Sequence, residues 1–159
     1  MKYTLIQNIS KTPENISCTY FSPQEKLLDN IDVLITSFKG IYPDGSLGKN
    51  HATYISKKVI SGLIEFDPEC VILDFRELTY NWGNSILSVF QEIALFKDGE
   101  NTPEEPDFPI LVLVSEKSKN GIVSLLTPAT SNTIPNYIFE DINKVIKEAE
   151  KRGKYWLDN

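Results

Sequence analysis

Val71-Ile-Leu-Asp-Phe-Arg-Glu-Leu-Thr-Tyr-Asn-Trp-Gly-Asn84 and Phe108-Pro-Ile-Leu-Val-Leu-Val-Ser-Glu116 are the two stretches that decide the fold class. Each contains an unbroken apolar run, Val71 to Leu73 in the first and Ile110 to Val114 in the second. Such runs leave no polar side for water and are typical of strands in a parallel sheet that is covered on both faces. The sequence therefore predicts two neighbouring, parallel, central strands.

The segments around these two strands predict further strands and helices. Tyr3 to Ile9 and Asp32 to Ile41 are predicted strands, and Tyr42-Pro-Asp-Gly45 is a turn sequence that ends the second one. Apolar residues at three- and four-residue steps predict helices over Ala52–Phe66, Ile86–Ala94 and Ile138–Ala149, with a short helix at Gly121–Leu126. Because strands alternate with helices, we expect an α/β fold with a mostly parallel central sheet and flanking helices.

Length and composition indicate one domain, residues 1–159. The chain is 41% hydrophobic, which provides enough apolar material for a sizeable core. No apolar stretch approaches the roughly 20 residues that span a bilayer, and the first residues do not resemble a secretory signal. Cys18 and Cys70 have neither metal-site nor disulfide spacing, which favours a reducing, cytoplasmic location.

The charge balance indicates the kind of partner. The formal net charge is −6 and the pI is about 4.8. A nucleic-acid-binding domain carries a basic patch or stripe, and the sequence shows only short lysine pairs between acids. We therefore expect neither a nucleic-acid nor a membrane partner. An acidic surface suits a basic protein partner, because complementary fields steer association.

Asp74, Arg76 and Glu77 directly follow the first apolar run, at the strand's carboxyl end. This is where ligands bind in open α/β sheets. The three side chains fit either an acid–base pair oriented by arginine or an ion-pair network, and we favour the network. Two carboxylates alone do not predict a metal site. His51, the only histidine, fits a general base or an exposed residue at a helix N-terminus, and we favour the second interpretation.

Two further groups of residues are candidates for partner binding. Ser115 and Ser118, with the lysines beside them, could form a serine–lysine pair, but helix capping is the favoured interpretation. Tyr80 and Trp82 lie on a predicted loop, where large aromatic side chains become interface anchors, although Trp82 also suits a plug over the sheet. We predict no catalytic, cofactor-binding or metal-binding residue. The predicted partner-binding residues are Asp74, Arg76, Glu77, Tyr80, Trp82 and three acids of the Asp98–Asp107 loop, Glu104, Glu105 and Asp107.

Both decisive stretches resemble parts of a known superfamily. Val71-Ile-Leu-Asp-Phe-Arg-Glu-Leu78 resembles the strand of tail-specific serine proteases that reads apolar-Leu-Asp-Leu-Arg-Gly-Asn-Pro-Gly-Gly, and the stretch from Ile110 resembles their next core strand. The resemblance covers about Asp32 to Leu126 and implies the β-β-α units of the Clp-protease/crotonase superfamily. It places Asn120 at the nucleophile and leaves only Gly83, beside Trp82, for the paired oxyanion glycines. It therefore implies a degenerate domain, a pseudoenzyme without the family's chemistry.

Three functions remain open from the sequence. The first is a non-enzymatic protein-binding domain, such as a bacterial immunity protein that inhibits a basic toxin. The second is a crotonase/Clp-superfamily enzyme that acts on a peptide or thioester through Asp74, Glu77 and His51. The third is a regulatory module that resembles the anti-sigma-factor antagonists, whose strand reads apolar-Leu-Asp-Leu-Ser-Gly-Val. Their phosphorylatable Asp-Ser step is absent, because Tyr80-Asn-Trp-Gly-Asn84 stands there.

Overall fold

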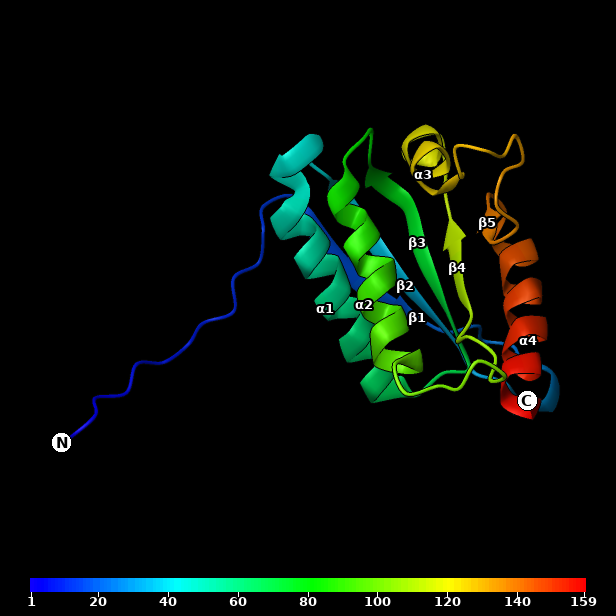
Figure 1. Ribbon diagram of the computed structural model, residues 1–159, viewed down its shortest axis with the longest axis horizontal. Helices are drawn as coiled ribbons and strands as arrows, with labels where there is room; N and C mark the ends of the chain where they lie inside the picture. Colours follow the sequence, from blue (N-terminus) through cyan, green and yellow to red (C-terminus); the bar gives the residue numbers. More distant parts are fainter.

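One five-stranded sheet organises the chain, and the computed structural model describes all of it, residues 1–159 (Figure 1). The strands lie in the order β1-β2-β3-β4-β5. β1 is antiparallel to β2, whereas the pairs β2–β3, β3–β4 and β4–β5 are parallel. Their bounds are β1 Ile16–Phe21, β2 Val33–Ile41, β3 Cys70–Thr79, β4 Ile110–Leu113 and β5 Ile138–Phe139. The sheet is therefore mixed, and the prediction of a mostly parallel sheet is corrected.

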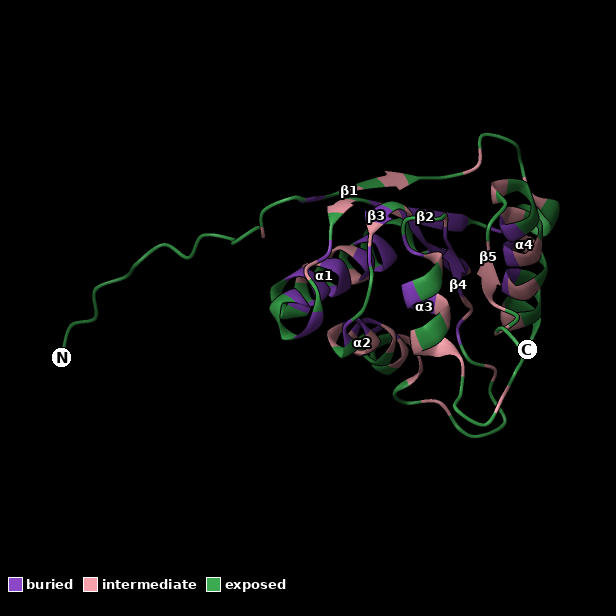
Figure 2. Ribbon diagram, turned by 90° about the horizontal axis from the view of Figure 1, so that it is seen from above, coloured by how far each residue is buried: buried purple, intermediate pink, exposed green.

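Helices cover both faces of this sheet (Figure 2). Their bounds are α1 Lys49–Phe66, α2 Leu87–Asp98, α3 Lys119–Leu126 and α4 Ile142–Asp158, with short 3-10 turns η1 Leu28–Asn30, η2 Gly45–Gly48 and η3 Asn84–Ile86. Alternate residues of β3 explain the two layers. Val71, Leu73 and Phe75 join the core with α1 and α2, whereas Cys70 and Ile72 join the smaller core under α4. A strand that is buried on both faces needs an unbroken apolar run.

The two decisive strands lie where the sequence predicts. β3 and β4 are parallel neighbours, and each has another strand on its other side. Within β3, Val71 to Phe75 are all buried. None of the helices is both long enough and apolar enough to cross a membrane.

Two other predicted elements differ from the structure. Tyr3–Ile9 is extended but pairs with nothing, and the first strand is β1 instead. Ile16, Cys18 and Tyr20 of β1 pack into the core that contains α1, whereas Tyr3 and Ile9 have no such neighbour. The last helix begins at Ile142 rather than Ile138, because Asp141 caps it by accepting a hydrogen bond from the Lys144 N–H at 3.0 Å.

Candidate functional site

The carboxyl end of β3 carries a closed ion-pair network. Asp74 is only 5% exposed. Its carboxylate accepts hydrogen bonds from Arg76 Nε at 2.9 Å, Arg76 Nη2 at 3.0 Å and the Arg76 backbone N–H at 3.1 Å. Ser37 Oγ on β2 donates a fourth at 2.7 Å. Both carboxylate oxygens are thus engaged by groups of the chain itself, which is the ion-pair network that the sequence favours.

The network keeps Asp74 ionised. Burial alone would raise the pKa of the Asp74 carboxyl, but the hydrogen bonds from Arg76 and Ser37 outweigh burial and hold the pKa below its ordinary value. A carboxyl group with a lowered pKa is already ionised in mild acid and stays ionised at neutral pH. Asp74 is therefore a structural anion and not a proton donor.

Asp74 should make stability depend on acid in a specific direction. Because the pKa of Asp74 is lower in the folded chain, the unfolded chain binds the proton more readily, and stability rises with pH. The contribution is complete above the ordinary carboxyl pKa of about 4 and is lost as pH falls through the folded value. Wild type should therefore be more stable than Asp74→Asn at neutral pH, and the two should converge in acid. Urea unfolding of both proteins from neutral to acidic pH tests this prediction. A constant difference in unfolding free energy between the two at every pH would contradict it.

The segment after β4 docks onto the end of β3. Ser115 Oγ donates to the Arg76 carbonyl at 2.6 Å, and Ser118 Oγ donates to the Phe75 carbonyl at 2.8 Å. The Tyr80 N–H donates to the Lys117 carbonyl at 3.0 Å. Ser115 Oγ also accepts from the Lys117 N–H at 3.2 Å and so caps the strand-to-helix turn, as the sequence favours. Ser118 occupies the N-cap position of α3, but its hydroxyl makes no capping bond. Both hydroxyls also satisfy carbonyls of β3 that β4 is too short to pair. Lys117 and Glu77 form an exposed ion pair at 3.1 Å.

Beyond this network, two loops meet and form what we call the tip, residues 45–48 and 80–86. The Gly45 N–H donates to the Trp82 carbonyl at 3.2 Å. The Trp82 ring lies so close to Gly45 that an added Cβ there would be 2.7 Å from Trp82 Cη2, and φ is +62° at Gly45 and +141° at Gly83. These are backbone conformations and contacts that favour glycine. The two loops of the tip are thus packed against each other.

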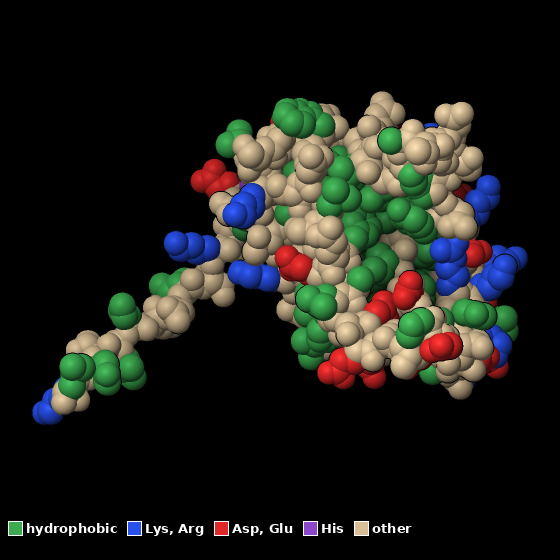
Figure 3. All heavy atoms as spheres, in the orientation of Figure 1, with side chains coloured by type: hydrophobic (Ala, Val, Ile, Leu, Met, Phe, Trp, Pro, Cys, Tyr) green, Lys and Arg blue, Asp and Glu red, His purple; other side chains and the backbone are tan.

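The exposed surface of the tip combines two large apolar side chains with three polar ones, Ser46, Asn81 and Asn84. Trp82 is 62% exposed and Leu47 is 77% exposed. Tyr80 is buried instead, and its hydroxyl donates to the Gly83 carbonyl at 2.6 Å, which supports the loop from below. Figure 3 shows apolar side chains gathered above η2 and the loop after β3. Trp82 therefore does not plug the sheet, and Tyr80 does not face a partner directly.

His51 lies elsewhere and is buried. Its Nε2 lies 2.9 Å from the Glu14 carbonyl, to which it donates, and its ring packs edge-on against Tyr42. The expected exposure is wrong because the chain before β1 covers the start of α1. By strand alternation, Asp74 shares the face of Ile72 under α4, opposite the α1 face. The structure does not bring His51 together with Asp74 and Glu77.

The three loop acids among the predicted partner-binding residues lie at the other end of the sheet. Glu104, Glu105 and Asp107 are on the connection from α2 to β4, at the amino ends of the parallel strands, whereas the tip follows their carboxyl ends (Figure 1). Beside this loop is a largely apolar groove of about 350 Å³ between α2 and β4, visible as the apolar hollow in Figure 3. Its lining comprises Phe90, Ala94, Asp98, Asp107, Phe108, Ile110 and Tyr137. The predicted partner residues therefore form two surfaces, not one.

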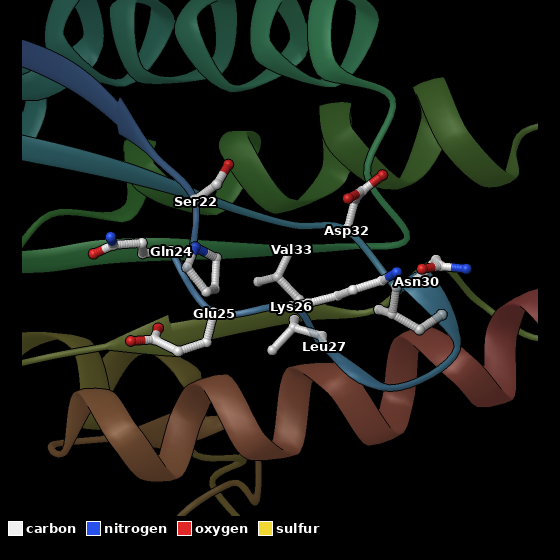
Figure 4. A pocket seen from close by; sticks show the side chains of 10 residues that line it. Ser22, Gln24, Glu25, Lys26, Leu27, Asn30, Asp32 and Val33 are labelled. Carbon is white, nitrogen blue, oxygen red and sulfur yellow. The ribbon is translucent and has the colours of Figure 1, made fainter.

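A further hollow lies between β1 and β2 (Figure 4). It measures about 270 Å³ and is lined by residues 22–27 and 30–33 of one connection, at the amino end of β2. It is built from one connection, whereas the tip joins two segments that follow different strands. No three His, Cys, Asp or Glu side chains converge as a metal site would require. Burial raises the pKa of the Cys18 thiol to about 11 and also raises that of Cys70, so both stay protonated near neutral pH.

The fold is similar to that of a known protein. A crystal structure of an anti-sigma factor antagonist from Mycobacterium paratuberculosis superposes with a TM-score of 0.51 at 11% sequence identity, over 88% of this chain and 98% of that chain. At this identity the similarity concerns the fold alone. No family model matches the sequence, and no curated protein matches it either.

This similarity overturns the Clp/crotonase assignment and the functions derived from it. The motif behind that assignment, apolar residues followed by Leu73-Asp74, has the composition of any buried parallel strand and is not specific to one superfamily. The strand order follows the chain from β1 to β5, as one sheet. The crotonase-like pseudoenzyme and the toxin-immunity protein are therefore both set aside.

Proposed function

We propose that this chain is a non-catalytic regulatory module that acts by binding another protein through the tip. Its fold similarity to an anti-sigma factor antagonist supports a regulatory role, since that protein is named for its action on another protein. The ion-pair network at the end of β3 supports a binding role over a chemical one, because Asp74 has no free lone pair to offer a substrate. The exposed, fixed Trp82 carries the proposal.

A fixed tryptophan is suited to anchoring a partner. Tryptophan is enriched among the residues that contribute most of the binding energy at protein interfaces. The contact with Gly45 and the hydrogen bond to its N–H hold the Trp82 segment before binding. Pre-organisation reduces the entropy that is lost when a side chain becomes ordered in an interface. The partner should therefore present an apolar pocket that accepts the indole ring beside Leu47.

Photo-cross-linking in the native cells tests this proposal. A photoreactive amino acid at Leu47 reports on the tip, and the same residue at Leu95 on α2 is the matched control, because both leucines are more than 70% exposed. We expect a defined protein adduct from position 47, lost in the Trp82→Ala background, and none from position 95. An adduct from position 95 alone would contradict binding through the tip.

The acidic loop should steer the partner without holding it. Neutralising Glu100, Glu104, Glu105 and Asp107 as Gln or Asn removes long-range attraction for a basic partner while leaving the tip unchanged. We expect association at low salt to slow by up to about tenfold and to lose its salt dependence, with the dissociation rate unchanged. Binding kinetics at two salt concentrations measure this. A faster dissociation rate in the variant would place the loop inside the interface instead.

A further inference from the structure

The two edges of the sheet are protected very differently. β5 is an edge of only two residues, and short edge strands offer little to pair with. β1 is an edge of six residues, Ile-Ser-Cys-Thr-Tyr-Phe, with no charged residue and no proline. Charges, prolines and bulges are the devices that normally keep an edge from pairing with another strand. β1 carries none of the side-chain devices and is open to strand addition.

The open edge presents regular hydrogen-bonding groups. The Ile41 N–H donates to the Asn15 carbonyl, and β1 pairs with β2 in antiparallel register from Ile16 to Phe21. In an antiparallel pair the backbone groups alternate between facing the neighbour and facing away. Ile16, Cys18 and Tyr20 therefore direct their N–H and carbonyl groups away from β2. At Cys18 the N–H already faces the Tyr54 hydroxyl on α1. Apolar rings also flank this edge, since Phe66 on α1 packs against Tyr20, and both Phe66 and Phe21 are exposed.

The segment before β1 has the composition of the missing strand. Residues 1–13, which we call the arm, form no helix or strand and extend away from the sheet (Figures 1 and 2). Tyr3, Leu5 and Ile9 fall on one side of an extended chain by alternation. Tyr3, Leu5, Ile6 and Ile9 are each at least 79% exposed. An uncharged stretch that mixes apolar residues with Thr4, Gln7 and Asn8, Tyr3 to Ile9, is thus attached to a sheet with an unpaired edge strand.

The chain between the arm and β1 is held in a way that directs the arm away from its own edge. His51 Nε2 binds the Glu14 carbonyl, and the Ile41 N–H binds the Asn15 carbonyl. Asn15 adopts a positive φ of 61°, and Pro13 restricts Thr12 to extended backbone. For the arm to fold back onto its own β1, the chain would have to reverse between Ile9 and Pro13. A second copy can receive the extended arm without any such change.

We propose that two copies of this chain exchange arms, with Tyr3–Ile9 of each copy adding a sixth strand to β1 of the other. Reciprocal exchange uses the same two surfaces in both copies, so the assembly closes as a dimer and leaves no open β1 edge. One row of arm side chains then covers the exposed Phe66, and the other row covers Phe21. This dimer is independent of the tip, which lies on other loops.

The mass of the full chain in solution tests the exchange. We expect light scattering after size exclusion to give a dimer. Leu5→Arg combined with Ile9→Arg should raise the dimer dissociation constant by at least about 100-fold. Both changes replace apolar side chains of one row of the arm, which the dimer would bury, by charged ones. Leu95→Arg, an equally exposed leucine on α2, should remain dimeric. A monomeric wild type, or a dimer that persists in the double variant, would overturn the proposal.

Amide hydrogen exchange distinguishes the arm-exchanged dimer from the other possible arrangements of the arm. In the dimer, the amides of residues 3–9 and the outward amide of Tyr20 should be protected together, and the double variant should lose protection at both places. A monomer with a protected arm would show that the arm folds back onto its own β1. A dimer with an unprotected arm would show a different interface. Either result would overturn arm exchange, and neither depends on the partner proposed for the tip.

Discussion

Asp74→Ala should lower the free energy of unfolding by about 3 kcal/mol, because it leaves Ser37 and the Arg76 guanidinium without their shared acceptor. Hydrogen bonds to charged groups contribute about 1.5–3 kcal/mol each, and a partner left unpaired in a buried site adds its desolvation cost. Arg76 is more than one third exposed, so water recovers part of this loss. The expected loss in unfolding free energy is therefore smaller than the sum of the contributions of the four hydrogen bonds.

Glu77→Ala on the same strand provides the matched control. Glu77 also forms an ion pair, with Lys117, but both side chains are exposed. Exposed pairs contribute less than about 1 kcal/mol. Urea unfolding of both variants, with unchanged slopes, measures the difference. Equal losses of unfolding free energy in the two variants would mean that the buried network does not stabilise the carboxyl end of β3 more than an exposed ion pair does.

Trp82→Ala should raise the dissociation rate of the partner complex at least about 30-fold, the kinetic equivalent of the 2 kcal/mol that defines a hot spot. The ring is mostly exposed in the free chain, so its removal should leave the unfolding free energy nearly unchanged. The association rate should change little, since the substitution removes no charge.

Leu95→Ala is the control for this prediction, as a large exposed apolar side chain on a helix away from the tip. It should leave both rate constants unchanged. If Trp82→Ala binds as wild type does while Leu95→Ala binds more weakly, the interface lies on α2. A large loss of stability in Trp82→Ala would instead make Trp82 a structural support for Gly45.

The central strands could be predicted because consecutive apolar residues indicate a strand that is buried on both faces. Val71 to Leu73 and Ile110 to Val114 have no polar alternation, and only a doubly covered strand suits them. The arrangement Asp74-x-Arg76 likewise indicates an ion pair, because the two side chains emerge on the same side of a strand. Both inferences depend on local spacing alone.

The rest depends on contacts between distant segments. Tyr3–Ile9 has the composition of a strand, yet β1 forms the edge strand instead. Cys18 and Tyr20 of β1 pack against the core that contains α1. The superfamily could not be read from a buried-strand motif that several α/β folds share. The tip can be predicted only in part, since nothing near Trp82 in the sequence shows that Gly45, 37 residues earlier, lies against its ring. The only local indication is the pair of glycines in this turn, Gly45 and Gly48, which permits close contact with a ring.

Hydrogen exchange of the full chain with and without its purified protein partner tests binding through the tip most directly. The proposal predicts that bound partner slows exchange in residues 45–48 and 80–86, while α1, α2 and α4 exchange as in the free chain. Slower exchange confined to the α2–β4 loop and the groove beside it, with the tip unchanged, would contradict it.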